Sequence, residues 1–127
     1  MSEVLIVDDD PVHAGIAEMV LKRAGFSLRR ATDGPLALEA LAKDPLPGLV
    51  LLDVMLPKLD GFEVLRRIRA DARTRDLPVI MVTSMSRDKD AARGRALGAN
   101  DYIVKPLMDT DFLRRVRALL KVDPPGS

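Results

Sequence analysis

Residues 4–12, VLIVDDDPV, place four apolar side chains directly before three consecutive aspartates and a proline. A short continuous apolar run is typical of a strand that is buried on both faces of a parallel sheet. Three carboxylates that follow such a strand would repel one another and could not lie in a core. We therefore expect residues 4–7 to form a central strand and residues 8–10 to face a functional crevice at its carboxyl end.

The rest of the chain alternates between strand-like and helix-like patterns. Glycines at 25 and 98 are placed to end helices, and Asp60 is placed to cap the start of one. Alternating strands and helices predict an α/β fold with a parallel sheet that is covered on both faces. The further expected strands are 26–31, 49–53, 79–83 and 101–106, and the expected helices are 12–24, 35–43, 62–70, 91–97 and 109–121.

Composition limits the classes of protein to consider. The chain has 127 residues, 20 Lys and Arg against 19 Asp and Glu, and no cysteine. Disulfides and thiolate metal sites are therefore excluded, and a net charge of +1 gives no overall attraction to nucleic acid. We find no signal segment and no apolar run that could span a membrane, so a cytoplasmic protein is expected. We expect one domain at 1–121 and a tail or linker at 122–127.

Polar side chains follow four of the expected strands. They are the aspartates 8–10, Asp53, the pair Thr83 and Ser84, and Lys105. In an open parallel sheet, ligands bind outside the carboxyl ends of the strands, so these groups should meet at one edge. Clustered carboxylates favour a hard divalent cation such as Mg²⁺, and a hydroxyl with a lysine suits the oxygens of a phosphoryl group. The sequence therefore predicts a combined magnesium and phosphoryl site.

At these positions the sequence resembles the response regulator receiver domains of two-component signalling. The resemblance covers residues 3–121 and keeps the order and spacing of the family's motifs. It implies a doubly wound, flavodoxin-like fold with five helices and a five-stranded parallel sheet in the order 2-1-3-4-5. The motifs that carry it are IVDDD (6–10), LLDVMLPKLDG (51–61), MVTS (81–84) and GANDYIVKP (98–106).

The resemblance also implies roles for the acidic residues. Asp53 corresponds to the phosphoacceptor, which takes a phosphoryl group from the phosphohistidine of a sensor histidine kinase or a phosphotransfer protein. Asp9, Asp53 and the backbone carbonyl of Met55 would bind Mg²⁺ directly, and Asp8 would act mainly through a coordinated water. Asp10 lies outside this set, at a position where the family tolerates acids.

Four further positions follow from the same resemblance. Thr83 and Lys105 would each bind one phosphoryl oxygen, and the Lys105–Pro106 peptide bond would be cis. Tyr102 matches the family's aromatic switch, whose ring turns inward when Thr83 moves toward the phosphoryl group. The switch would reshape a surface for a downstream protein or effector domain, while a homodimer stays open and no nucleic acid or membrane contact is expected. That surface is made of 88–97, 101–104 and 109–121.

Other functions fit the sequence less well. The stretch VDDDPV also matches the start of haloacid dehalogenase-like phosphatases, but there the second acidic cluster follows the lysine, whereas here Asp53 precedes Lys105. A receiver that no longer takes phosphate is disfavoured because every acceptor position is intact, and no glycine-rich nucleotide loop follows a strand. We expect no enzyme in the usual sense, but a domain that catalyses only its own phosphorylation and dephosphorylation.

Some of these residues also have purely structural interpretations. Aspartates after a strand often cap the next helix, and His13 is expected to be a surface residue. The arginines at 66, 67, 69, 73 and 75 are interleaved with aspartates and lack aromatic neighbours, so a solvated helix face is favoured over a nucleic-acid stripe. The arginines at 93, 95, 114, 115 and 117 are candidates for contacts with a protein partner.

Overall fold

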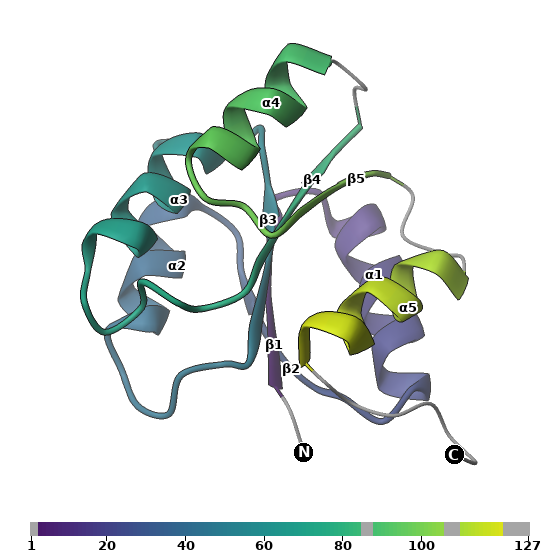
Figure 1. Cartoon of the computed structure of the whole chain (residues 1–127). Helices are drawn as coiled ribbons and strands as arrows, with labels where there is room; N and C mark the ends of the chain where they lie inside the picture. Colours follow the sequence, from purple (N-terminus) through teal and green to yellow (C-terminus); the bar gives the residue numbers. More distant parts are fainter. Residues whose placement is uncertain (1–2, 85–87, 106–109, 121–127) are drawn as a thin grey trace.

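A single five-stranded parallel sheet forms the centre of the molecule (Figure 1). The computed structural model describes residues 3–84, 88–105 and 110–120. The sheet has the order β2-β1-β3-β4-β5, which confirms the predicted α/β class and topology. The strands are β1 (Glu3–Val7), β2 (Ser27–Ala31), β3 (Leu49–Asp53), β4 (Val79–Thr83) and β5 (Asp101–Val104).

The helices cover both faces of this sheet. Figure 1 shows α1 and α5 on one face and α2 and α3 on the other, with α4 next to α3. Within the described ranges, no helix has the length and apolar character that crossing a membrane requires. The helices are α1 (Pro11–Arg23), α2 (Gly34–Leu41), α3 (Gly61–Ala70), α4 (Asp88–Ala96) and α5 (Thr110–Leu120).

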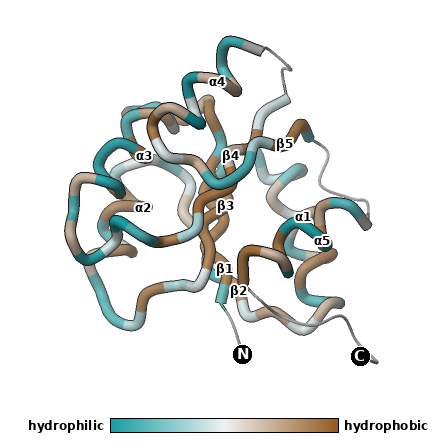
Figure 2. The backbone as a smooth tube through the Cα atoms, in the orientation of Figure 1, coloured by the Kyte–Doolittle hydropathy of each residue, from teal (hydrophilic) through white to brown (hydrophobic). Residues whose placement is uncertain are grey.

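Two apolar clusters, one on each face, explain why the central strands are apolar without interruption. In β1, Leu5 and Val7 pack toward α2 and α3, while Val4 and Ile6 pack toward α1 and α5. β3 and β4 alternate in the same way, and Figure 2 shows their hydrophobic residues concentrated at the centre. Each large apolar side chain that is fully buried contributes about 1.5–3 kcal/mol, so this double core holds the strand ends rigidly in place.

Helix ends largely follow the expected signals. Asp60 caps α3 by accepting a hydrogen bond from the Glu63 amide at 3.0 Å, as predicted. Gly25 and Gly98 have positive φ angles of 95° and 103°, which fits the ends of α1 and α4. Three boundaries were predicted wrongly: α2 ends at Leu41 rather than near 43, α4 begins at Asp88 rather than 91, and β5 ends at Val104 rather than 106. The second error arose because the polar first turn of α4 carries no apolar periodicity.

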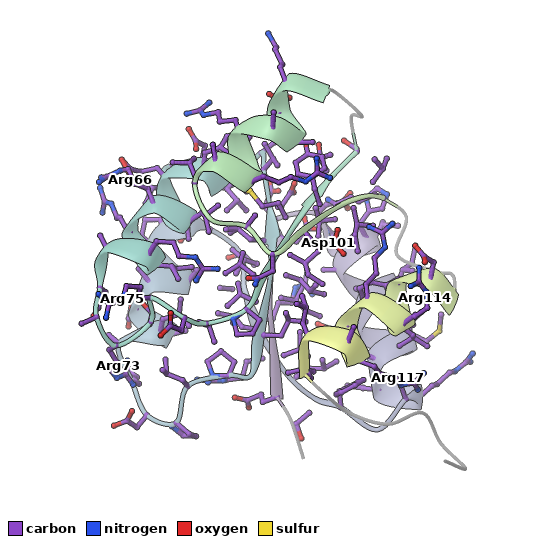
Figure 3. All side chains as sticks on the ribbon, in the orientation of Figure 1. Arg66, Arg73, Arg75, Asp101, Arg114 and Arg117 are labelled. Atoms are coloured by element: carbon purple, nitrogen blue, oxygen red, sulfur yellow. The ribbon has the colours of Figure 1, made fainter. Side chains whose placement is uncertain are left out.

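The arginines near the end of α3 do not form one solvated face, so that prediction is wrong in part. Arg66 is exposed and pairs with Glu63 at 2.6 Å, as expected. Arg73 instead contacts the carbonyl oxygen of Leu41 and donates to that of Lys43 at 3.0 Å, which ties the segment after α3 to the end of α2. Figure 3 shows Arg66, Arg73 and Arg75 on one side of the molecule and Arg114 and Arg117 on the other, so they make no continuous basic stripe.

Replacing Gly61 with alanine should lower the free energy of unfolding by about 2 kcal/mol, because the added methyl group overpacks the backbone of β3. A Cβ at Gly61 would fall inside van der Waals contact with the carbonyl oxygen of Asp53 and 2.9 Å from the Cα of Val54. Gly15→Ala in α1 is the control, because a Cβ there meets nothing within 4 Å. Urea unfolding should show the control to be as stable as wild type or up to about 1 kcal/mol more stable. Equal stability of Gly61→Ala and wild type would contradict the packing described.

Candidate functional site

The register of the strands brings the predicted site residues together. Val7 of β1 is paired with Leu52 of β3, so the next residues, Asp8 and Asp53, emerge side by side at the carboxyl edge. On the other side of Asp53, β4 ends at Thr83, whose carbonyl oxygen accepts a hydrogen bond of 2.7 Å from the backbone amide of Lys105. Residues that are far apart in sequence therefore meet because parallel strands end at one edge.

Lys105 lies between two buried carboxylates. Its Nζ is 2.8 Å from Oδ2 of Asp8 and 3.2 Å from Oδ2 of Asp53. All three side chains are almost fully buried, with exposed fractions of 5–8%. One ammonium group therefore balances two carboxylates that water hardly reaches, and the site keeps an excess of negative charge.

Asp9 adds a third carboxylate at the exposed rim of this site. Oxygen atoms of Asp8, Asp9 and Asp53 lie within 4.8 Å of one another, which is close enough for all three to bind one ion. Three carboxylates and one lysine leave a net charge of about −2, and a donor set made of oxygens suits Mg²⁺. The backbone amide of Met55 is 3.3 Å from Oδ1 of Asp53, so this stretch of backbone lies at the cluster. Coordination by the Met55 carbonyl stays a prediction.

Burial makes Asp53 an unusually weak acid when no metal is bound. Its pKa rises from 3.8 to about 6, first because burial disfavours the charged form. The charge on Lys105 opposes this shift, and the neighbouring negative charge of Asp8 adds to it. A further positive charge nearby would therefore favour the ionised form of Asp53.

Lys105 shows the opposite balance. Burial by itself would lower the pKa of its ammonium group. The hydrogen bond to Asp8 and the charges of Asp53 and Asp8 outweigh burial, so the pKa of Lys105 is raised. The lysine is therefore fully protonated at neutral pH and acts as a fixed positive charge in the site.

Asp10 belongs to the start of α1 rather than to the acidic cluster. Its side chain accepts a hydrogen bond of 3.0 Å from the Val12 amide and also contacts the ring of His13. These contacts, with His13 the larger cause, lower the pKa of Asp10. Of the three aspartates that were candidates to cap α1, only Asp10 does so, since Asp8 and Asp9 belong to the acidic cluster with Asp53. His13 keeps 32% of its side chain exposed, which agrees with the predicted surface position, and it is also paired with Asp10.

The remaining predicted positions lie beside this cluster or outside the described residues. The side chain of Thr83 is buried where β4 ends. Tyr102 packs its ring against the apolar cluster on the α2 and α3 face, and its hydroxyl oxygen is buried. Pro106, and with it the predicted cis peptide bond, lies outside the residues that the structure describes.

The loop between β3 and α3 contains contacts that the sequence did not reveal. The amide of Gly61 donates to the carbonyl oxygen of Val54 at 2.9 Å, which holds the start of α3 against the residue after Asp53. Lys58, with a φ of 68°, places its Nζ 3.2 Å from Oδ2 of Asp33, the buried cap of α2. The turn residues LDG were visible in the sequence, but a contact between positions 33 and 58 leaves no local signal.

Comparison with known proteins agrees with this geometry. The family model of the response regulator receiver domain matches residues 4–117. The chain belongs to this family. The receiver domain is 44% identical over 121 residues to RpaA of Synechocystis, a DNA-binding dual master transcriptional regulator. That match covers 95% of this chain and 50% of RpaA, so the chain spans about half the length of this relative. The expected lack of nucleic-acid contact therefore does not hold for such full-length relatives.

Solved structures of receiver domains show the same fold. A structure from Chloroflexus aurantiacus, assigned as a response regulator, has a TM-score of 0.90 and 38% identity, covering 94% of this chain and 98% of that one. The receiver domain of the Pseudomonas aeruginosa sensor histidine kinase PA1611 has a TM-score of 0.85 and 30% identity, with the same coverage of both chains. In that protein a magnesium ion is coordinated in the active site cleft. Receiver domains bind Mg²⁺ at an acidic pocket, and Asp8, Asp9 and Asp53 form an acidic cluster here.

Replacing Asp53 with asparagine should stabilise the metal-free domain above about pH 6 and have little effect near pH 4. The pKa of Asp53 is about 6 in the folded protein, against 3.8 for the free group. The folded state therefore holds this proton more tightly, and the resulting stability is present at low pH and lost as pH rises from about 4 to about 6. Asparagine never ionises, so above about pH 6 the free energy of unfolding of the variant should exceed that of wild type by at most about 3 kcal/mol.

Thermal unfolding in a chelating buffer at about pH 4 and about pH 8 measures this difference. Asp60→Asn is the matched control, because asparagine caps a helix as well as aspartate and the position is exposed. It should change stability little at either pH. An Asp53→Asn variant that is less stable than wild type at the higher pH would contradict the charge balance described.

Proposed function

We propose that this receiver domain accepts a phosphoryl group on Asp53 from the phosphohistidine of a sensor histidine kinase or a phosphotransfer protein. The main support is the placement of Asp53, a buried carboxylate at a strand end, 3.2 Å from the ammonium group of Lys105 and within the acidic cluster. Membership of the receiver family, in which an aspartate takes this role, supports the same assignment. The structural role of a turn residue would not require such a costly concentration of buried charge.

In the proposed reaction, a carboxylate oxygen of Asp53 attacks the phosphorus atom. A P–O bond forms, the P–N bond to the donor histidine breaks, and the bonding electrons stay on the imidazole nitrogen. Attack needs the ionised carboxylate, and a pKa of about 6 leaves Asp53 mostly ionised at neutral pH. Burial keeps this carboxylate poorly solvated, so little water must be removed before it reacts.

Asp8, Asp9, Asp53 and the backbone carbonyl of Met55 would hold Mg²⁺, with Asp8 acting mainly through a water molecule. When bound, Mg²⁺ offsets the negative charge of the carboxylates and of the phosphoryl oxygens. The excess of negative charge around Lys105 supports this assignment, because one lysine cannot balance three carboxylates.

Lys105 and Thr83 are proposed to bind the two phosphoryl oxygens that the metal leaves free. Lys105 is held by Asp8 at 2.8 Å, so its ammonium group can stay in the site while its contact with Asp53 is replaced by one with the phosphoryl group. Thr83 stands next to Lys105 in the sheet, because the Lys105 amide donates to the Thr83 carbonyl oxygen at 2.7 Å. The hydroxyl and the ammonium group thus come from adjacent strands at the same edge.

The output of the domain is proposed to be a change in the α4-β5-α5 surface, with Tyr102 and Thr83 as the switch. Tyr102 lies on β5 below α4, where its Cδ2 would be 3.6 Å from a Cβ at Gly94. A downstream protein or an effector domain would read this surface, and the domain itself is proposed to bind protein rather than nucleic acid. We also propose that its activity is limited to its own phosphorylation and dephosphorylation, within a domain at 1–121.

The direct test is the intact mass of the protein after incubation with acetyl phosphate and Mg²⁺. Wild type should gain the mass of one phosphoryl group, and Asp53→Asn should gain none because it lacks the nucleophile. Asp60→Asn serves as the control and should be labelled like wild type. An unchanged mass of wild type would overturn the assignment, and repeated turnover of a generic phosphomonoester would favour a phosphatase instead.

Tyr102→Ala should leave phosphoryl uptake intact but weaken the response of the α4-β5-α5 surface, because the ring packs against the apolar cluster next to Gly94 of α4. Uptake is measured by intact mass, and the response by amide chemical shifts of α4, β5 and α5 before and after labelling. Phenylalanine at the same position is the conservative control and should retain most of the response. Identical shift changes in wild type and Tyr102→Ala would contradict a switching role for the ring.

A further inference from the structure

The guanidinium group of Arg69 joins several segments at the edge of the sheet opposite the acidic cluster. Nε donates to the Gly98 carbonyl oxygen at 3.0 Å, and Nη2 donates to Oδ1 of Asn100 at 3.0 Å. Nη1 donates to the carbonyl oxygens of Arg75 at 3.0 Å and Leu77 at 2.6 Å. All four acceptors are neutral oxygens, so Arg69 holds these segments by directed hydrogen bonds rather than by an ion pair. We call these four hydrogen bonds the clamp.

Asn100 extends this clamp into the sheet. Its side-chain Oδ1 also accepts a hydrogen bond of 2.8 Å from the backbone amide of Val79. The backbone amide of Asn100 in turn donates to the Val79 carbonyl oxygen at 2.8 Å. Arg69, in the last turn of α3, is therefore tied to the first residue of β4 and to the residue before β5. Gly98 fits this arrangement, because its φ of 103° favours glycine and a Cβ there would lie 3.0 Å from Nε of Arg69.

Helix α4 has few other attachments, and they lie in its C-terminal half. Between residues 89 and 96, Gly94 alone is buried, so no side chain in that range anchors α4 in the core. Gly94 lies close to the sheet, where a Cβ would be 3.2 Å from Sδ of Met81. The guanidinium group of Arg93 stacks on the ring of Phe62, 4.3 Å from its centroid. An open groove of about 350 Å³ lies between the first half of α3 and the C-terminal half of α4, where Phe62, Arg66, Arg93 and Ala96 line it.

The other end of α4 is close to the acidic site in sequence. β4 ends at Thr83 and α4 begins at Asp88, so only residues 84–87 connect the site to the start of the helix. Figure 1 shows α4 with one end toward the connection from β4 and the other turning back into β5. Thr83 is thus much closer along the chain to the N-terminal end of α4 than to the segment that the clamp holds.

We propose that Arg69 is a positioning residue that fixes the C-terminal end of α4, so that α4 moves as a lever about Gly98. The N-terminal end of α4 changes position when the site takes a phosphoryl group, and the segment 97–100 stays in place. This inference rests on the proposed function and adds the element that converts the state of the site into a tilt of α4. A helix clamped at one end responds by rotation, which directs the change to its N-terminal half and keeps the register of β5 unchanged.

Amide hydrogen exchange of the whole domain tests the clamp without phosphorylation. Arg69→Lys keeps the charge but cannot reach four acceptors, so exchange at Val79, Ala99 and Asn100 should become about tenfold faster. Arg66→Lys is the matched control, because Arg66 lies on the same helix but is exposed. Asn100→Asp retains an acceptor oxygen for both donors and should preserve protection at Val79. Exchange within about twofold of wild type at all three amides in Arg69→Lys would overturn the clamp.

The same measurement after labelling with acetyl phosphate and Mg²⁺ tests the lever. In wild type, exchange at amides 92–94 should change while amides 97–100 stay within about twofold of their unlabelled rates. In Arg69→Lys the change should spread to 97–100. Equal changes at both segments in wild type would overturn the lever. If the intact mass shows no added phosphoryl group, the proposed function is wrong and the lever is wrong with it. The exchange rates of the unlabelled protein still decide whether Arg69 forms the clamp.

Discussion

The contact of one ammonium group with two buried carboxylates is the interaction on which the site depends. Lys105 lies 2.8 Å from Asp8 and 3.2 Å from Asp53, and neither carboxylate has much access to water. Removing the ammonium group would leave two buried carboxylates without a compensating charge, and breaking a buried pair in this way typically costs about 3–5 kcal/mol. The contacts of Lys105 allow the site to form, but its single positive charge does not balance all of the carboxylates. That remaining negative charge favours the binding of a cation, which is the basis of the proposed phosphoryl transfer.

The sheet supplies the rigidity that this arrangement needs. β1 and β3 are buried on both faces and in register, so the carboxylates that follow them cannot move apart. The loop after Asp53 is held by Gly61, which has no room for a side chain. α4 differs from the other helices, because no side chain between residues 89 and 96 is buried, and Arg69 binds the segment that directly follows it. In the proposed lever, a rigidly held site acts on this one helix.

Most of the fold and of the site could be predicted from the sequence, because the determining signals are local. The apolar runs ending in Asp8 and Asp53 indicated central strands, and the rule for parallel sheets placed Thr83 and Lys105 at the same edge. Long-range polar contacts could not be predicted, because they depend on which neutral oxygens face a side chain after folding. Arg69 and Arg73 looked like members of a charged helix face, yet their guanidinium groups bind backbone carbonyls. The ion pair of Asp33 with Lys58 also joins positions that are far apart in sequence, so no local pattern predicts it.

The most direct test of this charge balance is the NMR titration of the Asp53 carboxyl carbon in the metal-free domain. A midpoint near pH 6 is expected, because burial outweighs the attraction of Lys105. Adding Mg²⁺ should move the midpoint to lower pH, since a bound cation favours the ionised carboxylate. A midpoint near the ordinary value of 3.8 that does not respond to Mg²⁺ would contradict a buried, charge-deficient acceptor at Asp53.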